Sequence, residues 1–375
     1  MDFPPCHHCK LSLFYDAYFW TVTEHFSFMR RCIELAKQGA GHVAPNPMVG
    51  AVLVHEGRII GEGYHRQYGD AHAEVNCVDN VQPKDIPYIC KSILYVSLEP
   101  CAHFGKTPPC ADLIIRHRIP HVVIGCSDSF EKVNGSGMQK LLSAGIKTEI
   151  GILKEECRAL NKRFFTFHEK ERPYIILKWA QTANGKTAAD GGMTVKISNG
   201  TTNKTVHKWR TEEAAIFAGT NTVIQDDPAL TARHWPGKNP VRVVVDNELR
   251  ILSHAKIFRE DAQTVIINRQ KNEQAGHLLF WKVTDGESFE VAFARCLREL
   301  QLTSVLIEGG GKILQVFIDA GLWDEARVIT NSTLQIPGGV LAPILNREVS
   351  TGTEWIFDDR IDFYKKETNE FLYYD

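Results

Sequence analysis

Runs of apolar residues divide the chain into alternating helices and strands. Residues 26–37 place apolar side chains on one face at helical spacing, which predicts an amphipathic helix that ends at two glycines. Residues 49–54 and 58–64 are rich in β-branched and apolar residues and flank a turn at Gly57, so they predict a hairpin. The other elements expected in the first half are helices beginning near His72 and Pro109 and strands over 93–98, 121–125 and 146–150. This order predicts a three-layer α/β/α domain.

The second half begins after a charged segment, residues 155–165, which we expect to form one helix. The short polar stretch from His168 to Arg172 then marks the boundary between two domains. Beyond it the pattern predicts strands over 173–180, 214–218, 241–245, 264–267 and 304–307, helices over 206–213 and 289–300, and a loop over 225–233. We therefore expect an N-terminal extension over 1–24, a first domain over 25–168 and a second over 173–375.

Three consecutive glycines follow the last of these strands. Glu308-Gly309-Gly310-Gly311 leads directly into an amphipathic helix over 312–320. Bare backbone N–H groups at such a turn can approach a pyrophosphate, and the N-terminus of the helix adds positive potential. The spacing is not G-x-G-x-x-G, and a tightly packed strand-to-helix turn also requires glycines. Both interpretations of this segment stay open.

Composition and charge narrow the possible partners. The net charge is −2 and the pI about 6.7, whereas a general nucleic-acid binder normally carries a basic surplus. No apolar run has the length of a membrane span, so we expect no membrane partner. The ten cysteines show no disulfide spacing, which favours the reducing cytoplasm. Cys6 and Cys9 have metal-compatible spacing, but no second ligand pair follows, so a disordered tail is the alternative to a structural zinc there.

The residues that carry chemistry are concentrated between positions 72 and 110. His72-Ala73-Glu74 is followed by Pro100-Cys101 and Pro109-Cys110. One imidazole and two thiolates can hold a catalytic zinc whose open position takes a water with a pKa near 7. Zinc nucleobase deaminases use this pattern, with the glutamate as general acid and base rather than as a ligand. The spacing of eight residues between the cysteines exceeds their usual two, and the alternative is a buried histidine with two unrelated cysteines.

Two further expectations concern the same site. Pro45 and Pro47 hold Asn46 in an extended loop, where its amide offers a donor and an acceptor to the edge of a heterocycle. The alternative is an asparagine with only a turn-forming role. Glu74 lies at the start of a helix, where the dipole favours a carboxylate and is expected to lower its pKa.

These segments resemble the deaminase half of the bifunctional deaminase/reductases of riboflavin biosynthesis, the bacterial RibD type. The resemblance rests on Pro45-Asn46-Pro47, His72-Ala73-Glu74 and the run from Glu99 to Cys110, whose G-K-T-P-P-C spacing is typical of that branch. It implies a cytidine-deaminase-like fold, with zinc bound by His72, Cys101 and Cys110, Glu74 as the proton donor and Asn46 in contact with the pyrimidine.

The second half is similar to the reductase half of the same family, whose fold is like that of dihydrofolate reductase. The matching runs are P-Y-I-I-L-K, T-A-N-G-K-T, D-D-P-A-L-T-A-R, V-R-V-V-V-D and I-E-G-G-G. The resemblance implies an NADPH side made by Ala180, Thr222, Asp226, Gly310, Gly311 and Lys312, and a substrate side made by Thr194, Arg210, Leu230, Arg233 and Glu308. Arg210 and Arg233 would bind the phosphate of the substrate, surface ion pairs being the alternative. Lys196 departs from the pattern, because relatives often have tryptophan there.

The resemblance implies two reactions in one cytoplasmic homo-oligomer, a dimer or tetramer. The first deaminates 2,5-diamino-6-ribosylamino-4(3H)-pyrimidinone 5′-phosphate, and the second reduces the ribose of the product to ribityl with NADPH. One rival hypothesis is a nucleic-acid-editing deaminase with a binding module behind it, which predicts a basic, aromatic-rich second half. The other is a zinc deaminase whose second half only scaffolds or binds, which predicts ammonia release without oxidation of NADPH.

Overall fold

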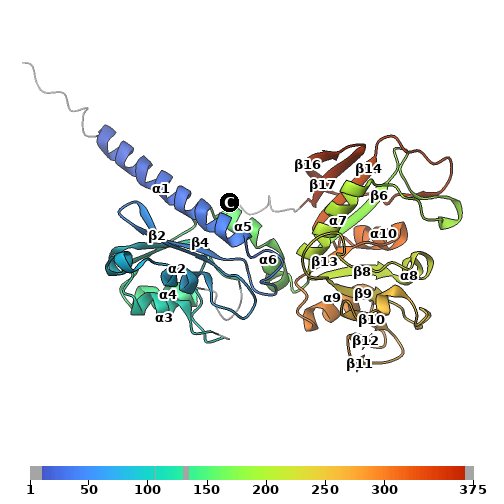
Figure 1. Ribbon diagram of the computed structural model, residues 1–375, viewed down its shortest axis with the longest axis horizontal. Helices are drawn as coiled ribbons and strands as arrows, with labels where there is room; N and C mark the ends of the chain where they lie inside the picture. The colour runs from blue at the N-terminus through green and yellow to red at the C-terminus, as the bar shows by residue number, and fades with distance from the viewer. Residues whose placement is uncertain (1–10, 106, 130–134, 368–375) are drawn as a thin grey trace, which may run out of the picture. The chain divides into compact units, whose positions relative to one another are not determined.

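A computed structural model describes residues 11–105, 107–129 and 135–367. The chain divides into two compact units, Met1–Glu169 and Lys170–Asp375 (Figure 1). The Cys6 and Cys9 pair lies outside the described residues. Within them, no helix combines the length and the apolar character needed to cross a membrane.

The first unit is built on a five-stranded sheet. Its strands are β1 (Gly50–His55), β2 (Arg58–Tyr64), β3 (Ile93–Leu98), β4 (His121–Cys126) and β5 (Lys147–Ile150), in the order β2-β1-β3-β4-β5. β1 pairs antiparallel with β2 and with β3, whereas β3, β4 and β5 run parallel. The hairpin expected from the alternation around Gly57 is the β1–β2 pair.

Helices cover both faces of this sheet (Figure 1). One apolar core joins the sheet to α1 (Leu11–Lys37), α5 (Lys154–Leu160) and α6 (Lys162–Glu169). A second core on the opposite face joins it to α2 (Ala73–Asp79), α3 (Cys110–Arg116) and α4 (Ser136–Ser143), with the 3-10 helix η1 (Pro83–Lys91) beside them. The three-layer α/β/α architecture predicted for this part of the chain is confirmed.

Two helices of this unit differ from expectation. α1 begins at Leu11 rather than at residue 26, and no proline or glycine interrupts its residues. The single helix expected over 155–165 is two helices, α5 and α6, which meet at Asn161. The side chain of Asn161 is committed to Met48: its Oδ1 accepts the Met48 N–H at 2.8 Å and its Nδ2 donates to the Met48 carbonyl at 2.8 Å.

The second unit contains a ten-stranded sheet among the described residues. In spatial order its strands are β11 (Glu273–Ala275), β12 (Leu278–Lys282), β10 (Thr264–Asn268), β9 (Val241–Val245), β8 (Ala215–Gly219), β13 (Ser304–Ile307), β6 (Tyr174–Gln181), β14 (Glu325–Asn331), β17 (Asp359–Lys366) and β16 (Glu348–Ile356). The strands from β12 to β14 are parallel, and antiparallel strands close both edges. A small second sheet pairs β7 (Lys186–Ala188) with β15 (Val340–Leu341).

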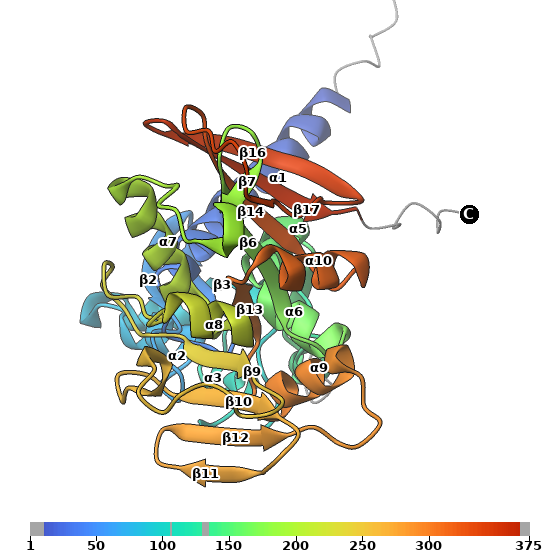
Figure 2. The same ribbon diagram turned by 90° about the vertical axis from the view of Figure 1, so that its right-hand side faces the viewer.

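Figure 2 shows helices on both faces of this large sheet. α7 (Gly200–Glu212) and α8 (Thr220–Asp226) pack on one face, and α9 (Phe289–Glu299) and α10 (Gly311–Asp319) on the other. The short helices η2 (Asp190–Gly192) and η3 (Lys256–Phe258) lie in loops. Because β13 lies between β8 and β6, the turns that follow these three strands come together at one edge of the sheet.

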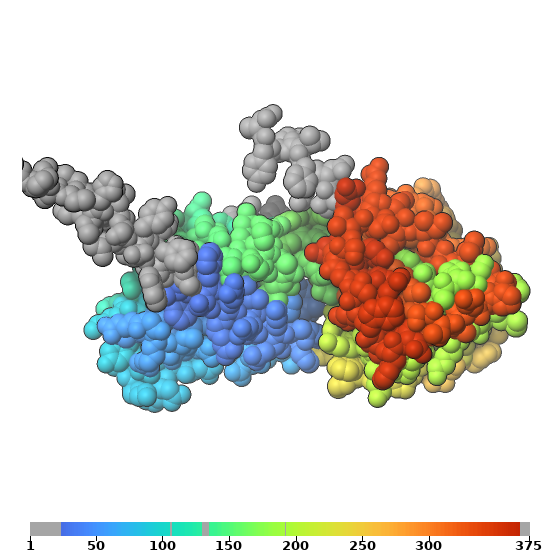
Figure 3. All heavy atoms as spheres, turned by 90° about the horizontal axis from the view of Figure 1, so that it is seen from above, coloured from blue at the N-terminus to red at the C-terminus, as the bar shows by residue number. Residues whose placement is uncertain are grey.

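The second unit also holds elements that the apolar pattern did not predict. α7 begins at Gly200 rather than residue 206, because the side chain of Asn199 accepts the N–H groups of Thr201 and Thr202 at 2.9 Å. α8 reaches Asp226, inside the segment expected to be a loop. β16 was missed because its residues are exposed on both faces and show no alternation. In the space-filling view the red C-terminal part of the described chain forms much of the visible face of this unit (Figure 3).

Two candidate active sites

Three metal-ligating side chains converge in the first unit. The ligand atoms of His72, Cys101 and Cys110 all lie within 4.8 Å of one another. The Nδ1 atom of His72 is 3.3 Å from the sulfur of Cys110 and 3.6 Å from that of Cys101. One imidazole nitrogen and two sulfurs at this spacing match the donor set of a zinc ion with one open position. The cluster predicted from the motif is therefore present in the fold.

The secondary structure explains how residues so far apart in the chain meet. His72 is the N-cap of α2, Cys110 is the first residue of α3, and Cys101 follows the end of β3. The backbone N–H of Cys110 donates to the Cys101 sulfur at 3.3 Å. Two helix N-termini thus face the cluster, and their positive potential stabilises thiolate ligands.

The electrostatics already favour one thiolate without a metal. Its hydrogen bonds with the Cys110 side chain and with His72 lower the pKa of Cys101 to about 4. The bond with Cys101 raises the pKa of His72, and the same thiolate, together with burial, holds the pKa of Cys110 above its ordinary value. A divalent cation would neutralise this crowding of negative charge, so the residues present fit zinc.

Glu74 lies beside the cluster in the first turn of α2, and its side chain is buried. Burial raises its pKa, against the opposing effect of His72. The expectation that the helix dipole would lower this pKa is therefore wrong, because desolvation of a buried carboxylate is the larger effect here. A raised pKa suits a group that must both take up and release a proton near neutral pH.

A buried histidine, missed in the sequence, orients Asn46. His65 is 2% exposed, its Nδ1 is 3.1 Å from the Ala71 carbonyl, and its Nε2 is 3.2 Å from the Nδ2 of Asn46. Since burial lowers the pKa of His65, the neutral ring donates to Ala71 and accepts from the Asn46 amide. The ring of His65 also meets that of His72 edge-on at 5.4 Å. Asn46 is therefore tied to the metal cluster through one side chain.

Glu99 is another residue whose role the sequence did not reveal. It is 4% exposed, and its carboxylate accepts the backbone N–H groups of Asp128, Gly135 and Met138 at 3.1–3.3 Å. A Cβ at Gly137 would lie 1.9 Å from the Pro100 carbonyl, so the start of α4 packs tightly against the Glu99-Pro100 segment. The signal for this role in the sequence was the position of Glu99 directly before the Pro-Cys motif. Glu99 thus anchors the loop that presents Cys101.

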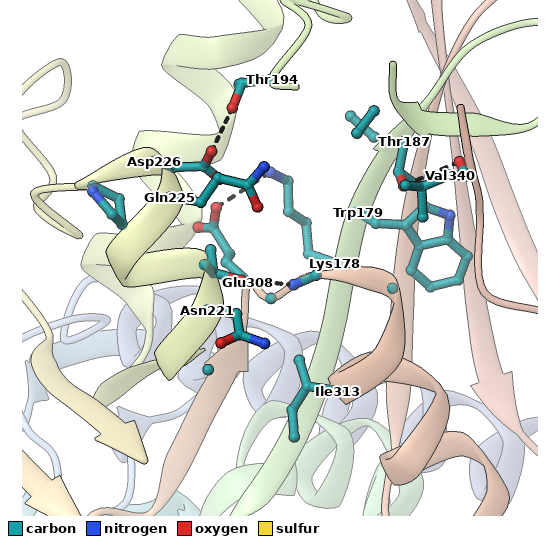
Figure 4. Close-up of a pocket in the computed structure, with 18 of the residues that line it drawn as sticks. Lys178, Trp179, Thr187, Thr194, Asn221, Gln225, Asp226, Glu308, Ile313 and Val340 are labelled. Atoms are coloured by element: carbon teal, nitrogen blue, oxygen red, sulfur yellow. Dashed lines mark hydrogen bonds and ion pairs between the residues drawn. The ribbon is translucent and has the colours of Figure 1, made fainter. Parts of the chain in front are cut away.

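The second unit holds a pocket of about 950 Å³ at the edge where the turns after β6, β8 and β13 meet. This volume lies in the range of ligand and cofactor sites. Residues expected on the NADPH side and on the substrate side line it together: Ala180, Thr194, Arg210, Thr222, Asp226, Leu230, Glu308, Gly310, Gly311 and Lys312. Lys196 also lines it, whereas Arg233 is exposed and is not among the lining residues. Figure 4 shows part of this wall.

A partly buried ion-pair network forms the wall at the end of β13. Arg210 holds the Glu308 carboxylate through Nε and Nη2 at 2.7 and 2.9 Å and donates from Nη1 to the Thr231 carbonyl at 2.8 Å. Lys178, for which the sequence motifs indicated no role, reaches Glu308 from β6 at 3.2 Å (Figure 4). Burial alone would raise the pKa of Glu308, but the charges of Arg210 and Lys178 hold it well below its ordinary value.

The glycine turn fits a phosphate-bearing cofactor. Gly310 is the N-cap of α10, and its backbone N–H donates to the Thr222 hydroxyl at 3.1 Å. A Cβ at Gly309 would lie 2.2 Å from Cγ2 of Ile313, so any larger residue there would require the Ile313 side chain to move. Across the pocket Thr194 donates its hydroxyl hydrogen to Asp226 (Figure 4). A bare backbone at a helix N-terminus, open to a large pocket, can hold the pyrophosphate of a dinucleotide.

Two family models match these two units separately. Residues 22–126 match the cytidine and deoxycytidylate deaminase zinc-binding region, and residues 173–343 match the RibD C-terminal domain. The first match contains the His72, Cys101 and Cys110 cluster, and the second contains the pocket wall. The two matches therefore assign zinc to the first unit and a reductase fold to the second.

Whole-chain relatives agree with these assignments. The chain is 41% identical over 305 residues to the riboflavin biosynthesis protein RibD of Aquifex aeolicus, covering 80% of this chain and 84% of that protein. It is 39% identical to RibD of Actinobacillus pleuropneumoniae, covering 81% and 82%. The crystal structure of a diaminohydroxyphosphoribosylaminopyrimidine deaminase/5-amino-6-(5-phosphoribosylamino)uracil reductase from Thermotoga maritima superposes with a TM-score of 0.83 at 34% identity, covering 92% of this chain and 99% of that one. The chain belongs to the RibD family of riboflavin biosynthesis, as a bifunctional enzyme with a zinc-dependent deaminase and an NADPH-dependent reductase in one polypeptide.

Proposed function

We propose that the chain catalyses two consecutive steps on one phosphorylated pyrimidine. The first is hydrolytic deamination of 2,5-diamino-6-ribosylamino-4(3H)-pyrimidinone 5′-phosphate, and the second is reduction of the ribose side chain of the product to ribityl. The observation that carries this proposal is the presence in one chain of a His-Cys-Cys cluster beside a buried glutamate and of a large pocket with a glycine turn. The name of the Thermotoga maritima relative contains both activities.

In the deaminase site we assign the proton transfers to Glu74. Zinc bound by His72, Cys101 and Cys110 supplies the Lewis acidity that makes water a nucleophile at neutral pH. Glu74 takes the proton of the attacking water and delivers it to the departing amine, a task that its raised pKa supports. Asn46, held by His65, contacts the edge of the pyrimidine with the amide oxygen that the histidine leaves available.

In the reductase site NADPH supplies the hydride, and the residues of the pocket position both reactants. The glycine turn at the start of α10 would hold the pyrophosphate, and Ala180, Thr222, Asp226 and Lys312 would form the rest of the NADPH side. Thr194, Leu230 and Glu308 would form the substrate side. Lys178 and Glu308 present a cation and a carboxylate to the sugar hydroxyls, and Arg210 keeps Glu308 in place. Phosphate binding by Arg210 and Arg233 stays a prediction.

The decisive experiment is a coupled assay on the pathway pyrimidine. Ammonia release and loss of NADPH absorbance are recorded separately on the same full-length protein. We expect ammonia release without NADPH and NADPH oxidation only after deamination. Ammonia release with no oxidation of NADPH at any substrate concentration would support the rival in which the second half only scaffolds or binds.

The role of Glu74 is tested by Glu74→Gln. The amide keeps the size of the side chain but cannot carry a proton, so we expect the rate of deamination to fall by about 10²–10⁴-fold while stoichiometric zinc is retained. Reduction of separately supplied deaminated substrate serves as the internal control and should be unchanged. Ammonia release at the normal rate would show that another group moves the proton.

Assembly and location complete the proposal. We propose a homo-oligomer, a dimer or tetramer, located in the cytoplasm. The eight cysteines of the described residues are all free thiols, which is consistent with a reducing compartment. Light scattering during size-exclusion chromatography would measure the mass, and a monomer at micromolar concentration would overturn the oligomer.

A further inference from the structure

One wall of the reductase pocket is a short stretch of backbone that begins at the last residue of α8. We call residues 226–232 the wall segment. Alternate residues of this segment line the pocket, namely Asp226, Pro228 and Leu230. Asp227 and Ala229, which lie between them, are not among the lining residues. Figure 4 shows Asp226 in this wall, where its carboxylate accepts the hydroxyl hydrogen of Thr194. One side of the segment therefore faces the cavity, and the other side faces the protein.

The backbone of the wall segment adopts two conformations that side-chain-bearing residues rarely take. Asp227 has a φ of 39° and Leu230 a φ of 51°, both in the left-handed region. Residues other than glycine keep such conformations only where surrounding contacts hold them. Leu230 is also 3% exposed, so it is packed as well as twisted. The shape of the wall therefore depends on contacts made from outside the segment.

A fully buried arginine makes the central contact. Arg242 lies on β9, and its Nε donates to the carbonyl of Ala229 at 2.9 Å. Its Nη1 donates to the carbonyls of Ile257 and Arg259, each at 2.9 Å, and its Nη2 donates to the carboxylate of Asp261. One side chain thus connects the wall segment to the loop that leads into β10.

Two neighbouring side chains hold the ends of the wall segment. The Lys256 N–H donates to Oδ1 of Asp227 at 2.8 Å, and its Nζ donates to the Asp227 carbonyl at 3.1 Å. The Oδ1 of Asn239 accepts the N–H of Ala232 at 2.8 Å, and its Nδ2 donates to the carbonyl of Asp261 at 2.9 Å. Like the contact from Arg242, these bonds reach residues that do not line the pocket. The segment is therefore held from behind.

The burial of a cation at this position indicates that Arg242 does more than fill space. An apolar side chain of similar volume is often as stable as a buried ion pair, or more stable. A guanidinium instead carries five N–H donors in a rigid planar fork, so it sets the distances between the carbonyls of separate segments. We propose that Arg242, which does not line the pocket, is a positioning residue of the reductase. By holding Ala229 it fixes Leu230 toward the substrate and Asp226 toward the cofactor. This inference rests on the proposed function of the second unit.

Arg242→Met tests this assignment, because it removes every donor and keeps an unbranched side chain. A displacement of about 1 Å in a wall that aligns two reactants can lower a rate by about 100-fold. We therefore expect kcat/KM for NADPH-dependent reduction of separately supplied deaminated substrate to fall about 10- to 100-fold, with a higher KM. Ammonia release should be unchanged. Arg242→Lys keeps the charge but not the fork, so its constants should lie between those of the wild type and Arg242→Met.

The KM separates positioning from stability. A variant that only unfolds more readily loses active enzyme, but its folded fraction keeps the KM of the wild type. Arg327→Met is the matched control, because Arg327 is also buried but lies on β14, where its Nε donates to Glu325 at 2.7 Å. It should lower the unfolding temperature and leave the KM within about twofold.

Asn239→Ala keeps the proposal testable if Arg242→Met does not fold. Asn239 is exposed, and its loss removes one hydrogen bond to the wall segment. We expect the KM for reduction to rise about 2- to 10-fold, as for the loss of one hydrogen bond. A KM equal to that of the wild type in both Asn239→Ala and Arg242→Met would overturn the proposal.

Hydrogen exchange of the free protein gives a readout that needs no substrate. The backbone amides of residues 227–232 should exchange faster in Arg242→Met than in the wild type, and Arg327→Met should leave their exchange unchanged. Unchanged exchange in Arg242→Met would overturn the proposal. If the wild type itself does not reduce the pyrimidine, the proposed substrate is wrong, and the NADPH dissociation constant then decides the inference. Arg242→Met should raise that constant at least about threefold, and an unchanged constant would count against Arg242.

Discussion

At the scale of single residues, the chemistry of both sites depends on carboxylates whose pKa is set by burial and by neighbouring charges. Glu308 is kept ionised by Arg210 and Lys178, which reach it from α7 and β6. Glu74 shows the opposite balance, since burial outweighs the effect of the neighbouring imidazole and raises its pKa. The same residue type therefore serves as a fixed charge in one unit and is the proposed proton carrier in the other, and its environment sets the difference.

Glu308→Gln should destabilise the second unit. The amide leaves two partly buried cations without their shared carboxylate, which should cost about 1–3 kcal/mol. Urea unfolding followed by tryptophan fluorescence would measure the loss. Glu248→Gln, at an exposed pair, should change the free energy of unfolding by less than about 1 kcal/mol. Equal effects of the two substitutions would contradict the structural importance of the network.

The stabilisation from Glu308 should also depend on pH with a defined sign. Because the pKa of Glu308 is lower in the folded protein than its ordinary value of 4.5, the unfolded chain binds more protons between these two values. The contribution is therefore fully present at neutral pH and is lost as the pH falls below about 4.5. The difference in unfolding free energy between wild type and Glu308→Gln should shrink at acidic pH and stay constant between about pH 6 and 8.

At the scale of elements, one asparagine determines where two helices end and begin. Asn161 separates α5 from α6 and is 3% exposed. Both polar atoms of its amide bind the backbone of Met48, two residues after Asn46. Asn161 thus holds the loop at Met48, more than a hundred residues earlier in the chain. This loop positions Asn46, the proposed substrate contact.

Asn161→Ala should therefore affect both stability and substrate binding. The partly buried N–H and carbonyl of Met48 would lose their partners, at up to about 1–3 kcal/mol for each group. We expect a lower midpoint of thermal unfolding and a higher KM for deamination, with zinc content unchanged. Asn80→Ala is the control, because it removes one exposed hydrogen bond to the Glu62 carbonyl. A normal KM in Asn161→Ala would show that the loop held by Asn161 does not contribute to substrate binding.

At the scale of the whole molecule, each unit has its own sheet and its own apolar cores. The metal cluster lies entirely in the first unit, and the pocket entirely in the second. Metal binding and nucleotide binding therefore depend on separate cores, and a change at one site should leave the other intact.

Removal of zinc tests this independence. A chelator should abolish ammonia release and lower the unfolding temperature of the first unit, because metal binding contributes to its stability. The NADPH dissociation constant should stay within about twofold, since none of the described ligands lies in the second unit. Cys101→Ala should have the same effects as the chelator, whereas Cys90→Ala, at an exposed thiol, should retain zinc. Full zinc content in Cys101→Ala would remove that residue from the ligand set.

The sequence by itself determined the features that depend on residue type and short spacing. The His72, Glu74, Cys101 and Cys110 motif identified a zinc deaminase, because few side chains can hold that metal and move that proton. The buried strands β1, β3, β9 and β13 followed from apolar runs bounded by turns, and the glycine turn before α10 from its three residues. These patterns are local, so no knowledge of the partner segments was required.

The tertiary structure decided what depends on contacts between distant segments. Lys178 and Arg210 lie 130 and 98 positions from Glu308, and nothing in the local sequence of either cation indicates that pairing. His65 behind Asn46, Asn161 between two helices and the exposed strand β16 escaped prediction for the same reason. Their roles come from hydrogen bonds and strand pairing with other segments of the chain, which a one-dimensional pattern of apolar and polar residues does not encode.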